Sequence, residues 1–401
     1  MTKLVAVTGI FGVLAMACGG GGGADGPTAT TQSSALTVAS SPLIPNLTPT
    51  PTSSGSTVPV TGAGKGDVNP YGVAFVPPGF PSGGLLRAGD VIAANFNDVT
   101  NAQGTGTTIV RVNAGADAGA DPSIFFTSAL PGLSTALGVL ERGYVLVGNL
   151  PSTGTGDQRG VCTPGPNGEE QGVGAGALQI IDRNGKLVTS LTSTRLLDGP
   201  WDLTVKDEGR RALVFVSNAL SGTVTRLELR VGGDGDGDGD DRVTVTGATQ
   251  IASGYAHRCD PAAFVVGPTG VALDEKRDTL FVASAGDNAI FAIDGASGTR
   301  RDAGRGRLVV NDAAHLHGPL GLALAPNGDL VSAQGDAVNP STDPNGQSAI
   351  VEFTRRGAFV AQFSVEPSTA GAAFGLAVDP LGGQFAIVDD ALNTLDQWTL
   401  P

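Results

Sequence analysis

One short strand motif recurs six times along this chain of 401 residues and limits the folds that the chain can adopt. Each copy has a Gly-(Leu/Val)-Ala-like core, often after Gly-Pro, and a second apolar run follows it that ends in a small, amide or acidic residue. The copies are 66, 63, 69, 51 and 54 residues apart, counted between Gly72, Gly138, Trp201, Gly270, Gly321 and Gly375. A repeat of this length indicates an array built from one structural unit.

The fifth copy shows most clearly what one unit contains. Four runs with strand character cover residues 321–325, 329–333, 349–353 and 358–365. The turns between them include Pro326-Asn327-Gly328 and Arg355-Arg356-Gly357, whose residues suit tight reversals of the chain. Four antiparallel strands with short links form one propeller blade. Six copies therefore predict an all-β, six-bladed β-propeller of four-stranded antiparallel blades.

The last blade predicts how the ring closes. Its first three strands begin near Phe374 and end near Leu400, so a fourth, outer strand is missing from this part of the sequence. An unpaired edge would favour aggregation. A strand-like run at Ser56–Thr61 precedes the first blade, and Pro59 is tolerable on an outer strand. We expect this N-terminal strand to complete the sixth blade.

The first 18 residues are predicted to be a lipoprotein signal peptide. Lys3 precedes an apolar run, Leu4–Met16, which suits a signal-peptide core and is too short to span a membrane. The end of the signal, Leu14-Ala15-Met16-Ala17-Cys18, resembles a bacterial lipobox, with Ala15 where Leu is more common. The resemblance implies a lipidated Cys18 that anchors the chain to a membrane. The alternative is an ordinary secretory signal with an unrelated cysteine.

Composition divides the rest of the chain. Residues 19–55 are rich in Gly, Ser, Thr and Pro and predict a flexible tether, and residues 56–401 make up the propeller. The expected location is the cell envelope, in the periplasm or at the cell surface, and the expected state is a monomer. The formal net charge is −14 and the sequence has no basic footprint, so nucleic acid is not an expected partner.

Two stretches carry a resemblance to a known family. Residues 267–272 (GPTGVA) and 280–290 (LFVASAGDNAI) resemble NHL-repeat propellers. Streptogramin-lyase-like and gluconolactonase-like proteins belong to the same neighbourhood. The resemblance covers about residues 56–400 and implies the fold; it implies little about function, because propellers include binding modules and several kinds of enzyme.

All three histidines are predicted to lie on one face of the ring. The loops that join strands two and three of each blade and the connections between blades share this face, which we call the top face. His257 lies in the connection from blade three to blade four, and His315 and His317 lie in the next connection. They could bind a divalent cation or supply a general base. The alternative is that they only pack within the connections.

Amide and carboxylate residues at the ends of the second strands are expected on the same face, where they could bind a cation or a polar ligand. The alternative is that they cap strand ends and satisfy turns. The candidate ligand or catalytic residues are Asn95, Asn149, Asn218, Asp287, Asn288, Asp336 and Asp389, and Asn97, Asp98, Gln334 and Asp390 follow the same pattern.

The other two cysteines also map to the top face. Cys162 lies in the long loop of blade two and Cys259 lies two residues after His257. In an exported protein an even pair predicts a disulfide, and a loop of this length would add about 4 kcal/mol through chain entropy. The alternative is two free thiols. If the bond forms, we expect His257 and His317 to face one cavity near Asn218 and Asp287.

A run of alternating Asp and Gly on the opposite face resembles the start of a calcium loop. Asp234, Asp236 and Asp238 would be its ligands, but the acidic residue needed at the twelfth position is absent, so a solvated loop is the alternative.

Two functions follow from the observations on the whole sequence. The first is a propeller that binds a small molecule or a protein partner at its top face. The second is a lyase- or lactonase-type enzyme that uses the top-face His, Asn and Asp residues.

Overall fold

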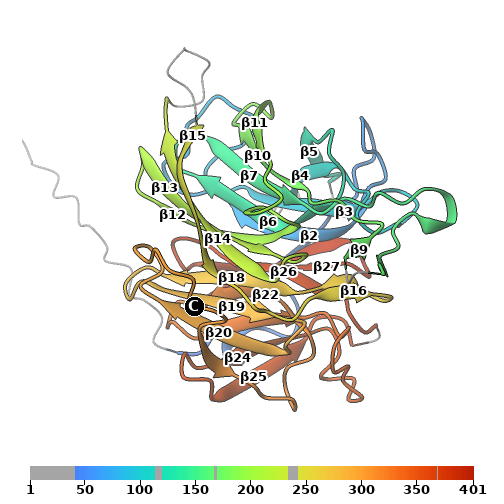
Figure 1. The fold of residues 1–401 in the computed structure, drawn as a ribbon, viewed down its shortest axis with the longest axis vertical. Helices are drawn as coiled ribbons and strands as arrows, with labels where there is room; N and C mark the ends of the chain where they lie inside the picture. Colours follow the sequence, from blue (N-terminus) through green and yellow to red (C-terminus); the bar gives the residue numbers. More distant parts are fainter. Residues whose placement is uncertain (1–40, 113–119, 167–168, 234–242, 368) are drawn as a thin grey trace, which may run out of the picture. The chain divides into compact units, whose positions relative to one another are not determined.

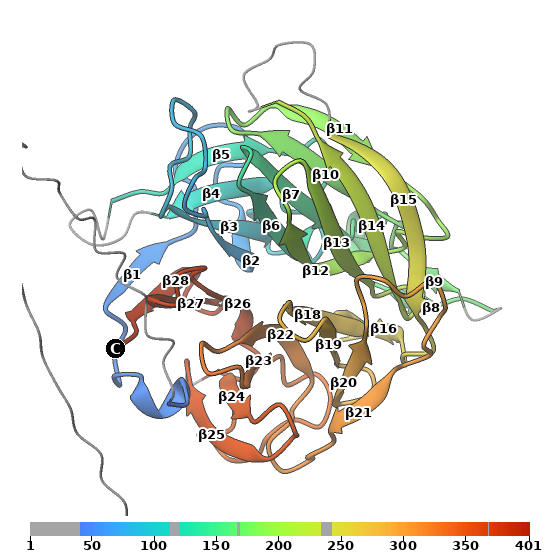
Figure 2. The same ribbon diagram turned by 90° about the vertical axis from the view of Figure 1, so that its left-hand side faces the viewer.

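The computed structural model of this chain describes residues 41–401, apart from 113–119, 167–168, 234–242 and 368. Six four-stranded antiparallel sheets are arranged around a common centre (Figures 1 and 2). Helical structure in the described part of the chain is limited to the short 3-10 turns η1 (Ile44–Asn46) and η3 (Gly156–Gln158). The predicted all-β, six-bladed propeller is confirmed.

Each blade begins with its innermost strand. Blade one contains β2 (Val68–Phe75), β3 (Val91–Asn97), β4 (Thr108–Val112) and β5 (Ser123–Thr127). Blade two contains β6 (Leu133–Leu140), β7 (Tyr144–Asn149), β10 (Ala177–Asp182) and β11 (Leu187–Leu191). Blade three contains β12 (Pro200–Asp207), β13 (Arg211–Asn218), β14 (Thr223–Val231) and β15 (Val243–Ala252).

The second half of the ring repeats this order. Blade four contains β18 (Pro268–Asp274), β19 (Thr279–Ser284), β20 (Ala289–Asp294) and β21 (Arg307–Val310). Blade five contains β22 (Pro319–Leu324), β23 (Leu330–Gln334), β24 (Ala349–Phe353) and β25 (Phe359–Ser364). Blade six contains β26 (Ala373–Val378), β27 (Gln384–Asp389), β28 (Thr394–Thr399) and the N-terminal β1 (Ser53–Ser56). Two small hairpins on the connections are β8 (Thr163–Pro164) with β9 (Glu170–Gln171), and β16 (Arg258–Asp260) with β17 (Phe264–Val266).

An N-terminal strand closes blade six, as predicted, but the predicted range Ser56–Thr61 is wrong. The closing strand is β1, which pairs antiparallel with β28 from Ser53 opposite Gln397 to Ser56 opposite Thr394. Because β28 begins at Thr394, residues beyond Thr57 have no strand to pair with. The position of the neighbouring edge therefore decides the register, against the low strand propensity of Ser and Gly.

Residues before β1 also pack on the propeller. The Leu43 and Ile44 side chains are buried, and their backbone N–H groups donate to the two oxygens of the Glu352 carboxylate at 2.8 and 2.7 Å. The Trp398 Nε1 donates to the Thr48 carbonyl oxygen at 3.0 Å. Residues 43–55, which composition assigns to the tether, therefore belong to the propeller.

Every innermost strand has a β-bulge or register shift near its start. The shift falls across the residue between Pro70 and Gly72 in blade one, and across the equivalent residues of the other five blades. A bulge changes the direction of the side chain at that point. In four blades the side chains that the bulge carries line one cavity at the top face: Tyr71, Trp201, Leu320 and Phe374.

Glycines of the repeat allow the innermost strands to approach one another. A Cβ atom on Gly270 would lie 2.5 Å from the Leu320 carbonyl oxygen of the next blade, and one on Gly321 would lie 2.5 Å from the Phe374 carbonyl oxygen. Such a distance leaves no space for a side chain. Blade three has Asp202 at this position, and its Oδ2 accepts a 2.9 Å hydrogen bond from the Val271 N–H of blade four.

Apolar side chains fill the spaces between the blades. One buried cluster joins blades one and two through residues such as Ile92 and Val147, and another joins blades two and three through Leu146 and Val216.

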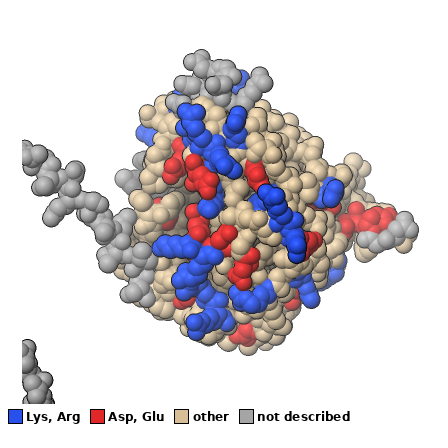
Figure 3. Space-filling view, turned by 60° about the vertical axis from the view of Figure 1, so that its left-hand side comes forward, with Lys and Arg blue, Asp and Glu red and all other residues tan. Residues whose placement is uncertain are grey.

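On the face shown in Figure 3, basic and acidic side chains lie next to one another. Within the described residues, no helix is long and apolar enough to cross a membrane.

Candidate ligand-binding site

A cavity of about 540 Å³ opens at the top face, where the innermost strands begin. Its walls come from segments far apart in the sequence. Tyr71 on β2, Trp201 on β12, Leu320 on β22 and Phe374 on β26 contribute apolar surface. Asp336 and Asp390 contribute carboxylates from the loops that follow β23 and β27. The volume is in the range of cavities that bind small molecules.

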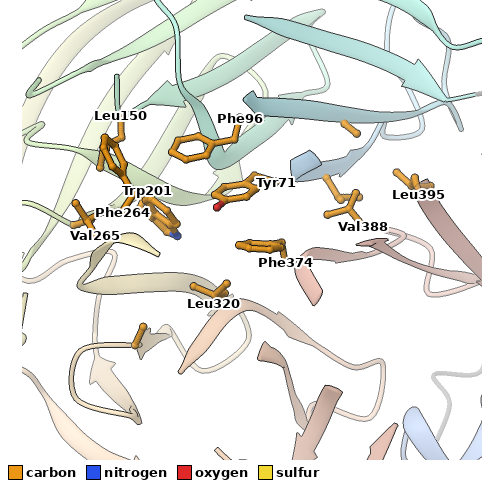
Figure 4. Packing of buried hydrophobic residues seen from close by; sticks show 14 of the residues in the cluster. Tyr71, Phe96, Leu150, Trp201, Phe264, Val265, Leu320, Phe374, Val388 and Leu395 are labelled. Atoms are coloured by element: carbon orange, nitrogen blue, oxygen red, sulfur yellow. The ribbon is translucent and has the colours of Figure 1, made fainter. Parts of the chain in front are cut away.

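The rings of Tyr71, Trp201 and Phe374, which belong to the cavity lining, lie close together with the Phe96 ring (Figure 4). The Tyr71 ring is stacked between Phe96 and Phe374, with centroid separations of 4.3 and 4.2 Å. The Trp201 indole meets Tyr71 edge to face at 5.7 Å. The Trp201 Nε1 is buried and has no hydrogen-bond partner among the described residues. Mutual packing holds these rings in place, which lowers the entropy cost of binding a ligand against them.

The two carboxylates differ in how they are held. The Asp336 Oδ2 accepts hydrogen bonds from the N–H groups of Ser348 at 2.8 Å and Gly371 at 2.9 Å. Its Oδ1 is buried without a partner in the described structure, and the residue is only 8% exposed. Asp390 is partly buried, and no described group donates a hydrogen bond to its carboxylate. The cavity therefore contains carboxylate oxygens that the fold leaves unsatisfied.

The protonation of two lining groups is shifted. Burial, with a smaller contribution from the neighbouring Asp389 carboxylate, raises the pKa of Asp390 to about 7. Burial, and then the Asp390 charge, raises the pKa of Tyr71 well above its usual value. Tyr71 is therefore a neutral phenol at any physiological pH, whereas Asp390 changes charge near neutrality. Shifted groups inside a cavity are typical of functional sites.

One wall of the cavity depends on the disulfide. Cys162 and Cys259 are bonded, as predicted, with their Cα atoms 5.2 Å apart. Cys259 lies on β16, and the other strand of that hairpin places Val265 and Val266 in the cavity wall. The Gln103 Nε2 also holds this hairpin through a 2.9 Å hydrogen bond to the Ala262 carbonyl oxygen. The long loop of blade two is thus joined to the wall of the cavity.

The predicted top-face amides lie on the expected face but do not line this cavity. Asn149 donates from Nδ2 to the Pro131 carbonyl oxygen, and Asn288 donates to the Leu316 carbonyl oxygen and accepts from the Gly318 N–H. Asn95 binds the Thr57 carbonyl oxygen, and Asn218 accepts from the Asp198 N–H. Each amide thus fixes a connection between two blades: Asn288 holds the one that leads into the next blade, and the other three hold the one that leads into their own blade. These bonds agree with the alternative of satisfied turns.

Two predicted carboxylates also have structural partners. Asp287 forms an ion pair with Arg305 at 2.8 Å and accepts a hydrogen bond from the Ala256 N–H at 3.0 Å. The Asp389 Oδ1 accepts from the N–H groups of the turn that follows it, at 2.9 and 3.1 Å. Of the described residues predicted at the top face, Asp336 and Asp390 line the cavity.

The three histidines lie outside the cavity lining. His257 contacts the Glu170 carboxylate at 3.0 Å, and His315 contacts Asp312 at 2.7 Å. His317 is buried, with Nδ1 2.6 Å from the Asn339 carbonyl oxygen. The structure does not bring His257 and His317 to one cavity near Asn218 and Asp287. Their expected place is wrong because the two rings have separate partners, His257 in the blade-two loop at Glu170 and His317 in the loop after β23 at Asn339.

The described residues contain no group of three or more His, Cys, Asp or Glu side chains that could hold a metal ion. The candidate calcium residues Asp234, Asp236 and Asp238 lie outside the part of the chain that the structure describes. The lipidation candidate Cys18 lies outside it too.

The aromatic residues of the cavity are absent from the predicted site. A signal for them exists in the repeat, since Tyr71, Leu320 and Phe374 each stand directly before its glycine, and Trp201 occupies the matching position before Asp202. Side chains there would point outward in a regular strand, and the bulge directs them to the cavity instead. An aromatic residue at this position in three of the repeats, Tyr71, Trp201 and Phe374, would have been the indication to follow.

Comparison with known proteins gives only structural matches. The sequence matches no protein-family profile and no curated protein. Among solved structures, the chain is similar to the gluconolactonase XC5397 from Xanthomonas campestris, with a TM-score of 0.45, 13% identity, and coverage of 83% of this chain and 86% of that one. It is also similar to virginiamycin B lyase from Staphylococcus aureus, with a TM-score of 0.44, 15% identity, and coverage of 87% and 99%. A functionally unknown protein from Desulfotomaculum acetoxidans DSM 771 has a TM-score of 0.42, 11% identity, and coverage of 83% and 83%.

Proposed function

We propose that this chain is an exported, lipid-anchored propeller that binds a small-molecule ligand in the top-face cavity. The observation that carries the proposal is the cavity itself, because aromatic surface and unsatisfied polar groups converge there in a volume of about 540 Å³. Large, mostly apolar cavities with a few converging polar groups are the usual form of a ligand site. The rings of Tyr71 and Trp201 are already packed, so the site needs little ordering when a ligand enters.

Binding without catalysis fits the cavity better than the lyase or lactonase alternative. That alternative relies on His257 or His317 as a base, and neither lines the cavity. A general base must come within hydrogen-bond reach of the proton that it removes. The protein partner that the sequence also allows would need a projecting group that enters the cavity, whereas a small molecule can be enclosed in it.

Filling the cavity is expected to abolish ligand binding. Ala391 lines the cavity, and its exposed side chain leaves room for Ala391→Trp to extend into the opening. Leu392→Trp adds a similar ring at the next residue, which is 61% exposed and is not part of the lining. Ligand-observed NMR would compare both variants with the wild type against a fragment library of amines, alcohols and carboxylates.

We expect some fragments to bind the wild type and Leu392→Trp with equal affinity, and Ala391→Trp to bind them at least about tenfold more weakly, a loss of about 1.4 kcal/mol. If no fragment binds the wild type, or if Ala391→Trp binds as well as Leu392→Trp, the cavity is not a ligand site.

The anchor is expected to depend on one side chain. Cys18→Ser removes the thiol that lipidation requires, so the chain should lose its lipid anchor and leave the membrane fraction. Fractionation of cells that express the wild type and the variant checks this, with the Cys162–Cys259 bond as a marker that both chains were exported. A Cys18→Ser chain that stays with the membranes would contradict the anchor.

A further inference from the structure

We propose that the ligand of the top-face cavity is an organic cation, a quaternary or protonated amine with an apolar part. The inference rests on the proposed function and adds the chemical class of the ligand. Three features of the cavity carry it: the sign of its charge, the unsatisfied carboxylates, and the aromatic surface beside them.

The charge of the lining has one sign. The described residues that line the cavity include two carboxylates, Asp336 and Asp390, and no Lys, Arg or His. The other polar side chains there are neutral amides and hydroxyls, such as Asn69, Gln103 and Thr369. A cavity whose only charged side chains are carboxylates attracts cations and repels anions.

The carboxylates lack internal compensation. The Asp336 Oδ1 has no partner within the described structure, although the residue is 92% buried (8% exposed), and the Asp390 carboxylate receives no hydrogen bond there. An ionised group that is partly removed from water without a partner is costly, and an opposite charge that enters the cavity would offset the cost. An entering cation can approach the partly exposed Asp390 carboxylate directly, and it acts on the Asp336 charge from a greater distance because the Asp336 Oδ1 is buried.

The aromatic wall suits a cation whose charge lies among alkyl groups. Trp201 and Phe374 contribute neighbouring rings to the lining (Figure 4), whereas both faces of the Tyr71 ring are covered by Phe96 and Phe374. Aromatic faces attract ammonium groups, and such clusters bind quaternary ammonium ions in other proteins. A bare divalent metal ion would instead need several oxygen ligands close together, and the described residues provide no such group.

The groups around Asp390 predict how binding depends on pH. It faces the Asp389 carboxylate and the neutral Tyr71 phenol, Asp336 lies on the same cavity, and Glu366 lies beyond Asp389. With a pKa of about 7, Asp390 is largely protonated at pH 5.5 and ionised at pH 8.5. A cation of fixed charge should therefore bind more tightly as the pH rises through 7, and its binding should release a proton.

Choline and 3,3-dimethyl-1-butanol form a matched pair of probes, because the alcohol has a neutral carbon in place of the charged nitrogen. Titration calorimetry would measure both against the wild-type protein at pH 5.5, 7.0 and 8.5. Asp390→Asn removes one of the two carboxylates that line the cavity and leaves Asp336 in place. Asp294→Asn makes the same change at a side chain that is 66% exposed and outside the lining, and serves as the control.

We expect choline to bind at least about tenfold more tightly than the alcohol at pH 8.5, and to weaken severalfold at pH 5.5. Asp390→Asn should lose most of this preference and its pH dependence, and Asp294→Asn should keep both. Equal binding of the two probes, or no effect of Asp390→Asn, would overturn the inference. If neutral fragments still bind in a way that Ala391→Trp blocks, the proposed function stands without it, and if nothing binds, both fail.

Discussion

A single methyl group at Gly375 is expected to prevent stable folding of the propeller. The Cβ atom of Gly375→Ala would collide with the Tyr71 carbonyl oxygen of blade one, and the Val73 N–H lies close by. Both contacts are backbone atoms of another innermost strand, so no side chain can rotate to make room. Blades six and one would have to separate, at a cost of more than about 3 kcal/mol. Thermal and urea denaturation would measure the loss.

Gly298→Ala is the matched control for this prediction. Gly298 has no atom within 4 Å of the added Cβ, and its backbone is not in the left-handed region. We expect this variant to unfold like the wild type. If Gly375→Ala has the same thermal midpoint as Gly298→Ala, the close approach of the innermost strands is not what the repeat glycines provide.

Removal of residues 1–57 should have a similarly large effect. It deletes β1 and leaves the outer edge of β28 unpaired. It exposes the surface that Leu43 and Ile44 cover, and it leaves the buried Glu352 carboxylate without its two N–H donors. Lost burial of two large side chains, together with an unsatisfied buried carboxylate, amounts to more than about 5 kcal/mol. The shortened chain is expected to aggregate, since its edge is open to other strands.

A chain that begins at Ser41 retains every contact named here and is the control. It should unfold at the same temperature as the full chain and remain monomeric in size-exclusion chromatography. If the chain that begins at Val58 is as stable and as monomeric as the one that begins at Ser41, β1 does not close the ring.

Much of the fold could be predicted because the close approach of the innermost strands constrains the same position in each repeat. The glycines of the innermost strands are required where neighbouring blades meet, as at Gly321 and the Phe374 carbonyl oxygen. The number of copies of the motif therefore indicates the number of blades. The position of the closing strand could not be predicted with the same accuracy. Its residues, Ser53–Ser56, have little strand propensity, and the free edge of β28 recruits them.

The site was predictable only in part. Topology alone brings Cys162 and Cys259 to one face, so the disulfide follows from the blade order. The blade order also places the amides on that face. It does not determine whether Asn218 binds a ligand or the nearby backbone at Asp198. The cavity is lined instead by residues such as Trp201, whose direction depends on a local bulge in β12. A bulge breaks the two-residue period on which strand predictions rest.

The two tryptophans of this chain offer the most direct test of ligand binding at the top face. The Trp201 indole lines the cavity, and its Nε1 has no partner in the described structure. Trp398 lies in blade six, where its Nε1 donates to the Thr48 carbonyl oxygen. In ¹⁵N-labelled protein each indole gives one NMR signal, and Trp398→Phe assigns them. On titration with choline or with a fragment found to bind, we expect the Trp201 signal to shift with saturation and the Trp398 signal to stay in place. A Trp201 signal that does not move while ligand binds, or a shift confined to Trp398, would contradict the account.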